Sequence, residues 1–143
     1  MVIMHSNCLE KQEQVIQMFS GCTTAEELYN KIIELGQQST PLSPEDKIPE
    51  NLVKGCQSKM YLKTEFDGEK MHFAAEADAL ISAGLATLLL MVYNEENPEV
   101  ILKCPPDYLE KIGITAALSP NRANGLYSLH LRMKQEALKI LTR

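Results

Sequence analysis

Apolar residues recur at helical spacing near the start of the chain, which predicts an amphipathic helix over residues 9–19. Its apolar positions are Leu9, Val15, Ile16 and Phe19, set among Glu, Lys and Gln side chains. A spacing of three or four residues brings such side chains to one face of a helix, where they can pack against a core.

A second helix is predicted to begin at Thr23. Residues 23–26 (TTAE) have the form of a capping box, with Thr23 as the N-cap and Glu26 reaching back to it. Apolar residues then recur every three or four positions as far as Leu35. Gly36 is expected to close the helix in the left-handed conformation.

The middle of the chain changes to a period of two, which is typical of half-buried strands. Residues 60–66 and 70–76 alternate between apolar and polar side chains, and Asp67-Gly68 between them is a strong hairpin signal. Residues 51–54 follow a loop with three prolines and are expected to form a short additional strand. The prediction is a small three-stranded antiparallel sheet.

The remainder of the chain is predicted to be helical. Residues 79–93 are apolar on nearly every side, so they should form a central buried helix with Asp78 as its N-cap. Residues 107–112 suit a short helix, while Asn97 and Ser119, each followed by proline, suit the N-caps of two others. The inward face of the last helix is expected to carry Leu126, Leu129, Met133, Ala137 and Ile140.

Composition narrows the class of protein. The 143 residues are 45% hydrophobic and 23% charged, which suits one domain over residues 1–143 with helices packed on a small antiparallel sheet, an α+β fold. The net charge of −5 argues against nucleic-acid binding. Residues 1–10 lack the layout of a secretory signal, and the longest apolar run, 79–92, is too short to span a membrane. We therefore expect a cytoplasmic protein without membrane association.

Residue types that bind metals or cofactors are sparse. The four cysteines are widely spaced: Cys8, Cys22, Cys56 and Cys104. They contain no CxxC pair and no secretion signal precedes them, so free thiols are expected. The three histidines, His5, His72 and His130, do not pair at metal-ligand spacing. No phosphate-binding glycine loop occurs, and the sequence therefore predicts neither a metal nor a cofactor.

Cys56 differs from the other cysteines in its sequence context. Gly55 precedes it, Gln57 and Ser58 follow it, and a predicted strand begins just beyond. A reactive thiol needs exposure, polar surroundings and a backbone that can present it, and this context offers all three. On these residues alone, a structural cysteine and a reactive one are equally good interpretations.

Four segments together resemble the SufE/CsdE family of sulfur acceptors. Residues 55–61 (GCQSKMY) resemble the family's GCQSxVW motif, and residues 28–36 (LYNKIIELG) resemble its YxYIIELG helix. Residues 77–85 (ADALISAGL) and 118–126 (LSPNRANGL) resemble its DSDAxIVKGL and LTPSRxxGL blocks. The segments occur in the family's order and spacing, and the likeness extends over nearly the whole chain from residue 10.

The resemblance implies a function in iron–sulfur cluster assembly. Proteins of this family take persulfide sulfur from a pyridoxal-phosphate cysteine desulfurase, stimulate that enzyme, and pass the sulfur to a SufBCD-like scaffold. Carried over by motif, Cys56 is the persulfide carrier, and Gly55, Gln57 and Ser58 shape its loop. Asp78 and Arg122 match positions associated with the surroundings of that loop and with desulfurase docking. The implied fold is SufE/IscU-like, and the implied protein is a carrier rather than an enzyme, either a monomer or a homodimer.

Two other functions remain open at this stage. An IscU-like iron–sulfur scaffold would need about three thiolates at one cluster, so Cys22 or Cys104 would have to approach Cys56. A cysteine-dependent hydrolase or peroxidase would need a histidine or arginine within hydrogen-bonding reach of the sulfur.

Overall fold

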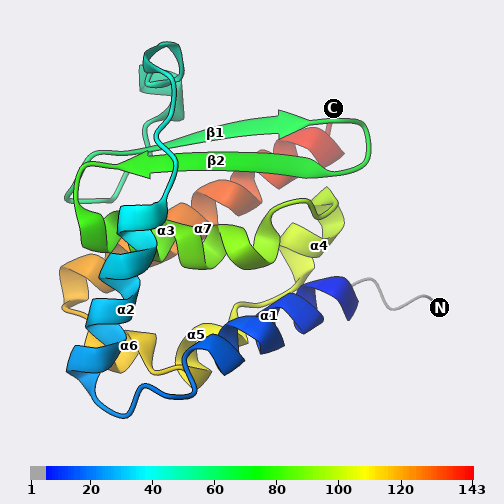
Figure 1. Ribbon diagram of the computed structural model, residues 1–143. Helices are drawn as coiled ribbons and strands as arrows, with labels where there is room; N and C mark the ends of the chain where they lie inside the picture. The colour runs from blue at the N-terminus through cyan, green and yellow to red at the C-terminus, as the bar shows by residue number, and fades with distance from the viewer. Residues whose placement is uncertain (1–5) are drawn as a thin grey trace.

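A computed structural model describes residues 6–143, which form an antiparallel hairpin packed with helices (Figure 1). The α-helices are α1 (Ser6–Met18), α2 (Ala25–Gln38), α3 (Leu80–Tyr93), α4 (Pro98–Lys103), α5 (Asp107–Lys111), α6 (Ile114–Ala117) and α7 (Pro120–Leu141). The strands are β1 (Met60–Phe66) and β2 (Met71–Ala77), and single 3₁₀ turns span Pro44–Asp46 and Pro49–Asn51. The α+β class is confirmed. His5 lies outside the described residues.

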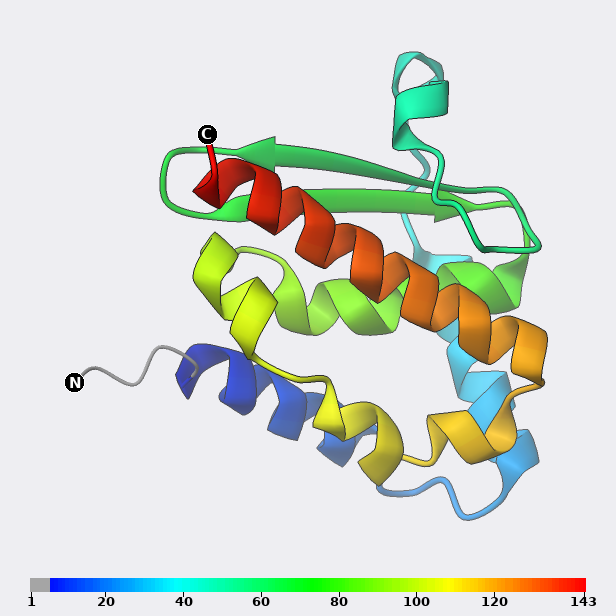
Figure 2. The same ribbon diagram turned by 180° about the vertical axis from the view of Figure 1, so that it is seen from behind.

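Helix α3 occupies the centre of the fold, as its apolar sequence predicts. It packs against α1, α2, α7 and β2. In Figure 1 the hairpin runs along one side of α3 and α1 along the other, and Figure 2, seen from behind, shows α7 crossing in front of both the hairpin and α3. Leu88, Leu89 and Val92 of α3 are fully buried in the shared hydrophobic core. Within residues 6–143, no helix combines the length and apolar character needed to cross a membrane.

The sheet has two strands in the described residues, so the prediction of three was wrong. Strands β1 and β2 pair antiparallel from Met60 opposite Ala77 to Phe66 opposite Met71. The expected third strand is reduced to an isolated bridge between Leu52 and Tyr61. Its residues cannot extend further, because a 3₁₀ turn occupies Pro49–Asn51 on one side and the chain turns away at Gly55 on the other.

The capping box of α2 is displaced by one residue from the predicted position. Thr24 is the N-cap, and Glu27 reaches back to the backbone N–H groups of Thr23 and Thr24 at 3.0 and 3.2 Å. The sequence TTAEE permits both registers, and the prediction chose Thr23 with Glu26. Hydrogen bonds to the Glu27 carboxylate lower its pKa, since they favour the charged form.

Gly36 does not close α2, which continues to Gln38. It is buried where α2 crosses α3, and a Cβ atom there would collide with the carbonyl oxygen of Leu80. Gly84 on α3 makes the corresponding close contact, since a Cβ atom there would collide with the carbonyl oxygen of Ile32. The glycine predicted as a helix terminator is therefore a contact residue between two helices.

Asp78 is not the N-cap of α3. The residue before the helix is Ala79, and Asp78 is exposed in the extended segment that leaves β2. Its backbone N–H donates to the Lys59 carbonyl oxygen at 3.1 Å, so the strand pairing holds the chain extended for one residue more than predicted. The predicted N-caps Asn97 and Ser119 are confirmed.

Helices α1 and α7 show how far periodicity defines a buried face. In α1 the buried positions are Cys8, Gln12 and Val15, whereas Leu9, predicted to face inward, is half exposed. In α7 the predicted inward positions Leu126, Leu129, Met133 and Ala137 are buried, and Ile140 packs partly against the core.

Candidate functional site at Cys56

The loop that carries Cys56 leaves the Leu52 bridge and enters β1, and Gly55 sets its path. Gly55 has a positive φ of 91°, a conformation that residues with a side chain rarely adopt. It also lies directly against Ser128 of α7, because a Cβ atom at position 55 would collide with the Ser128 hydroxyl. Glycine is therefore needed here both for the turn and for the close approach to α7.

The Cys56 thiol points from this loop toward the N-terminal half of α7. It is half-buried and donates to the Gly125 carbonyl oxygen at 3.6 Å. The sulfur lies close to Gly125, since a Cβ atom there would be at an ordinary contact distance of 3.7 Å from it. Burial raises the pKa of the Cys56 thiol, because desolvation disfavours the thiolate. In this position the sulfur is a protonated, weakly nucleophilic thiol.

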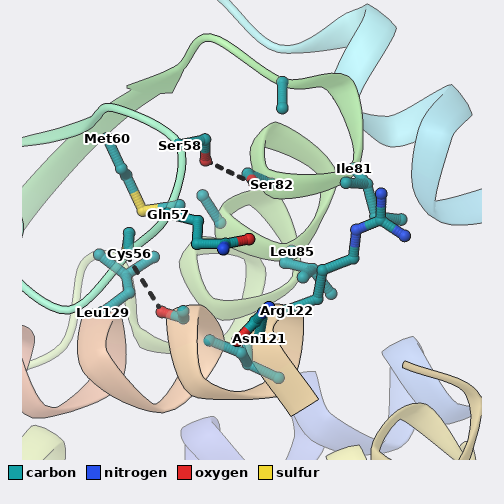
Figure 3. A pocket seen from close by; sticks show the side chains of 14 residues that line it. Cys56, Gln57, Ser58, Met60, Ile81, Ser82, Leu85, Asn121, Arg122 and Leu129 are labelled. Atoms are coloured by element: carbon teal, nitrogen blue, oxygen red, sulfur yellow. Dashed lines mark hydrogen bonds between the residues drawn. The ribbon is translucent and has the colours of Figure 1, made fainter. Parts of the chain in front are cut away.

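A second contact fastens the loop to α3. The Ser58 hydroxyl lies 2.8 Å from the Ser82 hydroxyl, in the first turn of α3, and both are partly buried (Figure 3). The loop is thus held from two sides, by α7 at Gly55 and Cys56 and by α3 at Ser58. Side chains separated by 24 residues in sequence fix the loop that presents the sulfur.

Cys56 lines a cavity of about 360 Å³ between its loop, α3 and α7. The apolar side chains around the cavity are Met60, Ala79, Ile81, Leu85, Ala86, Leu126 and Leu129, and the polar ones besides Cys56 are Gln57, Ser58, Ser82, Asn121 and Arg122. Figure 3 shows Cys56 and the Arg122 guanidinium on opposite sides, with Gln57 between them. The cavity can therefore hold a group attached to the sulfur in surroundings that are partly apolar and partly polar.

Two of the predicted site residues differ sharply in their placement. Arg122 lines the cavity, and its guanidinium stacks over the Tyr29 ring at 5.4 Å from the ring centroid. Asp78 does not line the cavity, and its side chain is exposed beside the loop. The structure thus brings Cys56, Gln57, Ser58 and Arg122 together around one cavity. Gly55 shapes the loop without lining the cavity, and Asp78 does not line it either.

Three residues of the site were missed by sequence reasoning about individual positions. Ser82 holds Ser58, Ser128 packs on Gly55, and Gly125 accepts the thiol hydrogen bond. Ser82 and Gly125 lie within the third and fourth resembling segments, and this is the signal that could have drawn attention to them. Ser128 lies outside the resembling segments, and no local pattern shows that either serine contacts the loop.

The other three cysteines lie away from this cavity. Cys8 and Cys104 are fully buried together, and Cys22 lines a smaller cavity between α2 and α6. All four are free thiols. Within residues 6–143, no group of three histidine, cysteine or acidic side chains is placed to hold a metal ion. The convergence that an iron–sulfur scaffold requires is therefore not found in this part of the chain.

Comparisons with known proteins identify relatives over most of the chain. The family described as "SufE: Fe-S metabolism associated domain" matches residues 13–137. An uncharacterized SufE-like protein of Synechocystis sp. is 30% identical over 125 residues, covering 87% of this chain and 79% of that protein. SufE-like protein 1, chloroplastic/mitochondrial, of Arabidopsis thaliana is 30% identical over 131 residues, which are 91% of this chain but 35% of the longer plant protein.

A solved structure shares the fold. The solution structure of a hypothetical protein from Thermus thermophilus matches with a TM-score of 0.74 and covers 93% of this chain and 97% of that one. Its sequence identity of 23% makes it evidence for the arrangement of the elements alone.

Proposed function

The chain belongs to the SufE family, associated with Fe–S metabolism, and on that premise we propose that it is a sulfur carrier loaded at Cys56 by a cysteine desulfurase. The observation that supports this most is the placement of the Cys56 sulfur, which lies on a clamped loop with a cavity beside it. A carrier needs one thiol that can be reached by a partner and space to shelter the sulfur it accepts.

The proposed chemistry is a transfer between two thiols. The Cys56 thiolate attacks the outer sulfur of a persulfide on the desulfurase, a new S–S bond forms at Cys56, and the desulfurase leaves as its own thiolate. No oxidant or reductant is consumed. Delivery to a SufBCD-like scaffold exchanges the roles: a thiolate of the scaffold attacks the outer sulfur of the Cys56 persulfide, and Cys56 leaves as a thiolate.

Loading requires a change in the resting site. Burial keeps Cys56 protonated, and the attacking species must be the thiolate. Docking of a desulfurase therefore has to expose the loop or bring a base or a cation to the sulfur. In this proposal Gly55, Gln57 and Ser58 govern loop movement, while Arg122 and the exposed Asp78 belong to the docking surface. The cytoplasmic location and the monomeric or dimeric state remain predictions.

The test is loading and stimulation of a pyridoxal-phosphate cysteine desulfurase. We expect Cys56→Ser to abolish both the increase in desulfurase turnover and the added sulfur seen on the intact protein by mass spectrometry. Cys22→Ser is the matched control, since Cys22 is also partly exposed and also lines a cavity. Loading that persists in Cys56→Ser, or that disappears in Cys22→Ser, would contradict the proposal.

A further inference from the structure

The cavity beside Cys56 is much larger than a carried sulfur atom needs. A sulfur atom is similar in size to a water molecule, whose share of liquid volume is about 30 Å³. The cavity of about 360 Å³ is roughly ten times larger, and it falls in the range typical of sites for small ligands. Shelter for a persulfide does not account for that volume.

The side of the cavity away from Cys56 carries positive charge at its rim, where the exposed Arg122 lies. The N-terminal ends of α3 and α7 both line it, α3 through its N-cap Ala79 and through Ile81 and Ser82, and α7 through Asn121 and Arg122. Neither helix has a side-chain hydrogen bond at its N-cap, in contrast to the capped N-terminus of α2. Two helix N-termini, each with a partial positive charge, thus converge with a guanidinium.

The two ends of the cavity therefore fit the two ends of one kind of molecule. At one end the sulfur of Cys56 can exchange with another sulfur, and at the other the Arg122 guanidinium and the helix N-termini can bind a carboxylate. The amides of Gln57 and Asn121 can hydrogen-bond to a peptide group lying between them. We propose that this cavity binds a small peptide thiol that carries a carboxylate, and that such a thiol can accept the sulfur from Cys56.

This inference rests on the proposed carrier function and adds a soluble acceptor to it. The thiolate of the peptide attacks the outer sulfur of the Cys56 persulfide. The S–S bond at Cys56 breaks, Cys56 leaves as a thiolate and takes up a proton, and the peptide becomes the persulfide. The step balances without an added oxidant or reductant.

The experiment compares two acceptors that differ in one charge. Cys56 is loaded with sulfur by inorganic polysulfide, which needs no desulfurase, and the protein is then mixed with cysteinylglycine or with its C-terminal amide. We expect transfer to cysteinylglycine to saturate with concentration and to be about three- to fivefold faster than transfer to the amide at low concentration. S-methyl-cysteinylglycine, which has no free thiol, should compete with the acid.

Arg122→Gln supplies the decisive variant, and Lys59→Gln its charge-matched control. Lys59 is exposed on the same loop but does not line the cavity. Arg122→Gln should remove most of the preference for the acid, while Lys59→Gln should preserve it. Equal rates with the two acceptors, equal effects of the two variants, or no competition by the S-methyl compound would overturn the proposal.

The outcome separates this inference from the proposed function. If polysulfide-loaded Cys56 discriminates between the acceptors but a desulfurase does not load it, the carrier function fails while the cavity assignment stands. If a desulfurase loads Cys56 but the two acceptors react alike, the carrier function stands and the peptide-thiol site is overturned.

Discussion

Cys56 and the Cys8–Cys104 pair lie toward opposite ends of α3 and show what separates an accessible thiol from a structural one. The pKa is raised by burial in all three, so this property does not distinguish them. The difference is access. Cys8 and Cys104 are 0% and 1% exposed, whereas Cys56 is half-buried on a loop beside a cavity.

The surroundings of the two ends differ in the same way. At the Cys8–Cys104 end Gln12 donates to the Cys104 sulfur at 3.5 Å, and the Tyr93 hydroxyl donates to the Cys104 carbonyl oxygen at 2.7 Å. At the other end the Cys56 thiol makes one long hydrogen bond to Gly125. The Cys8–Cys104 pair is enclosed in the hydrogen-bonded core, whereas Cys56 lies on a loop held by the contacts to Gly125 and Ser82.

Alkylation of the native protein should show the largest difference between the two ends. We expect iodoacetamide to modify Cys56 at least roughly 10³-fold faster than Cys8 or Cys104, because the buried pair reacts only when the core opens. Peptide mapping by mass spectrometry over time measures the rates. Similar alkylation rates at the three cysteines would contradict the proposed difference in access.

Acid should destabilise the protein through His130, which lies toward the Cys8–Cys104 end of α3. His130 is buried against the Tyr93 ring at a centroid distance of 5.1 Å, and burial, with a smaller effect of Lys134, lowers its pKa from 6.5 to about 4. The unfolded chain therefore binds a proton at a higher pH than the folded protein does. Stability contributed by neutral His130 is full above pH 6.5 and is lost as the pH falls toward 4.

The size of this effect follows from the shift in pKa. It corresponds to roughly 2 to 4 kcal/mol of unfolding free energy between pH 6.5 and 4. Urea unfolding at several pH values should show that His130→Gln flattens this part of the profile relative to the native protein. An unchanged profile in the variant would assign the acid sensitivity to other groups.

Replacement of each cysteine by serine compares how much the thiol contributes to the free energy of unfolding at the two ends of α3. A hydroxyl in place of a buried thiol should cost about 1 to 3 kcal/mol at Cys8 or Cys104, where the residues are fully enclosed. The same change at Cys56 should stay within about 0.5 kcal/mol, because its surroundings are open on the cavity side. Thermal unfolding of the three variants makes the measurement, and a larger loss at Cys56 than at Cys8 would reverse the comparison.

Sequence patterns predicted the elements better than their contacts. Apolar periodicity placed α2, α3 and α7, and Asp67-Gly68 placed the hairpin turn, because these features depend on neighbouring residues. Gly36 was misinterpreted because its partner on α3 lies far away in the chain. The third strand was overestimated because Pro49 and Gly55 limit the pairing to one bridge.

The same distinction applies to the site. Cys56 and its neighbours could be selected from their context and from the resembling segments. The Ser58–Ser82 contact and the carbonyl group of Gly125 could not, because each joins the loop to a helix through packing that no local pattern encodes. Asp78 illustrates the reverse case, since it belongs to a resembling segment yet lies outside the cavity.

The smallest expected effect concerns the hydrogen bond between Ser58 and Ser82, which holds the Cys56 loop against α3. Ser58→Ala removes the hydrogen bond to Ser82, whose net contribution is about 0.5 to 1.5 kcal/mol, so the loop should open more often. Alkylation of Cys56 should then be about two- to tenfold faster, with little change at Cys104.

Ser82→Ala supplies the matched variant, because it removes the same hydrogen bond from the other side. If the contact between the hydroxyls limits loop opening, the two single variants should accelerate alkylation equally, and the double variant should add little to either. Additive effects would mean that each serine acts through a separate contact. If neither variant accelerated alkylation, the loop would be restrained mainly by α7, through Gly55 and Cys56, and α3 would have no part in controlling access to the sulfur.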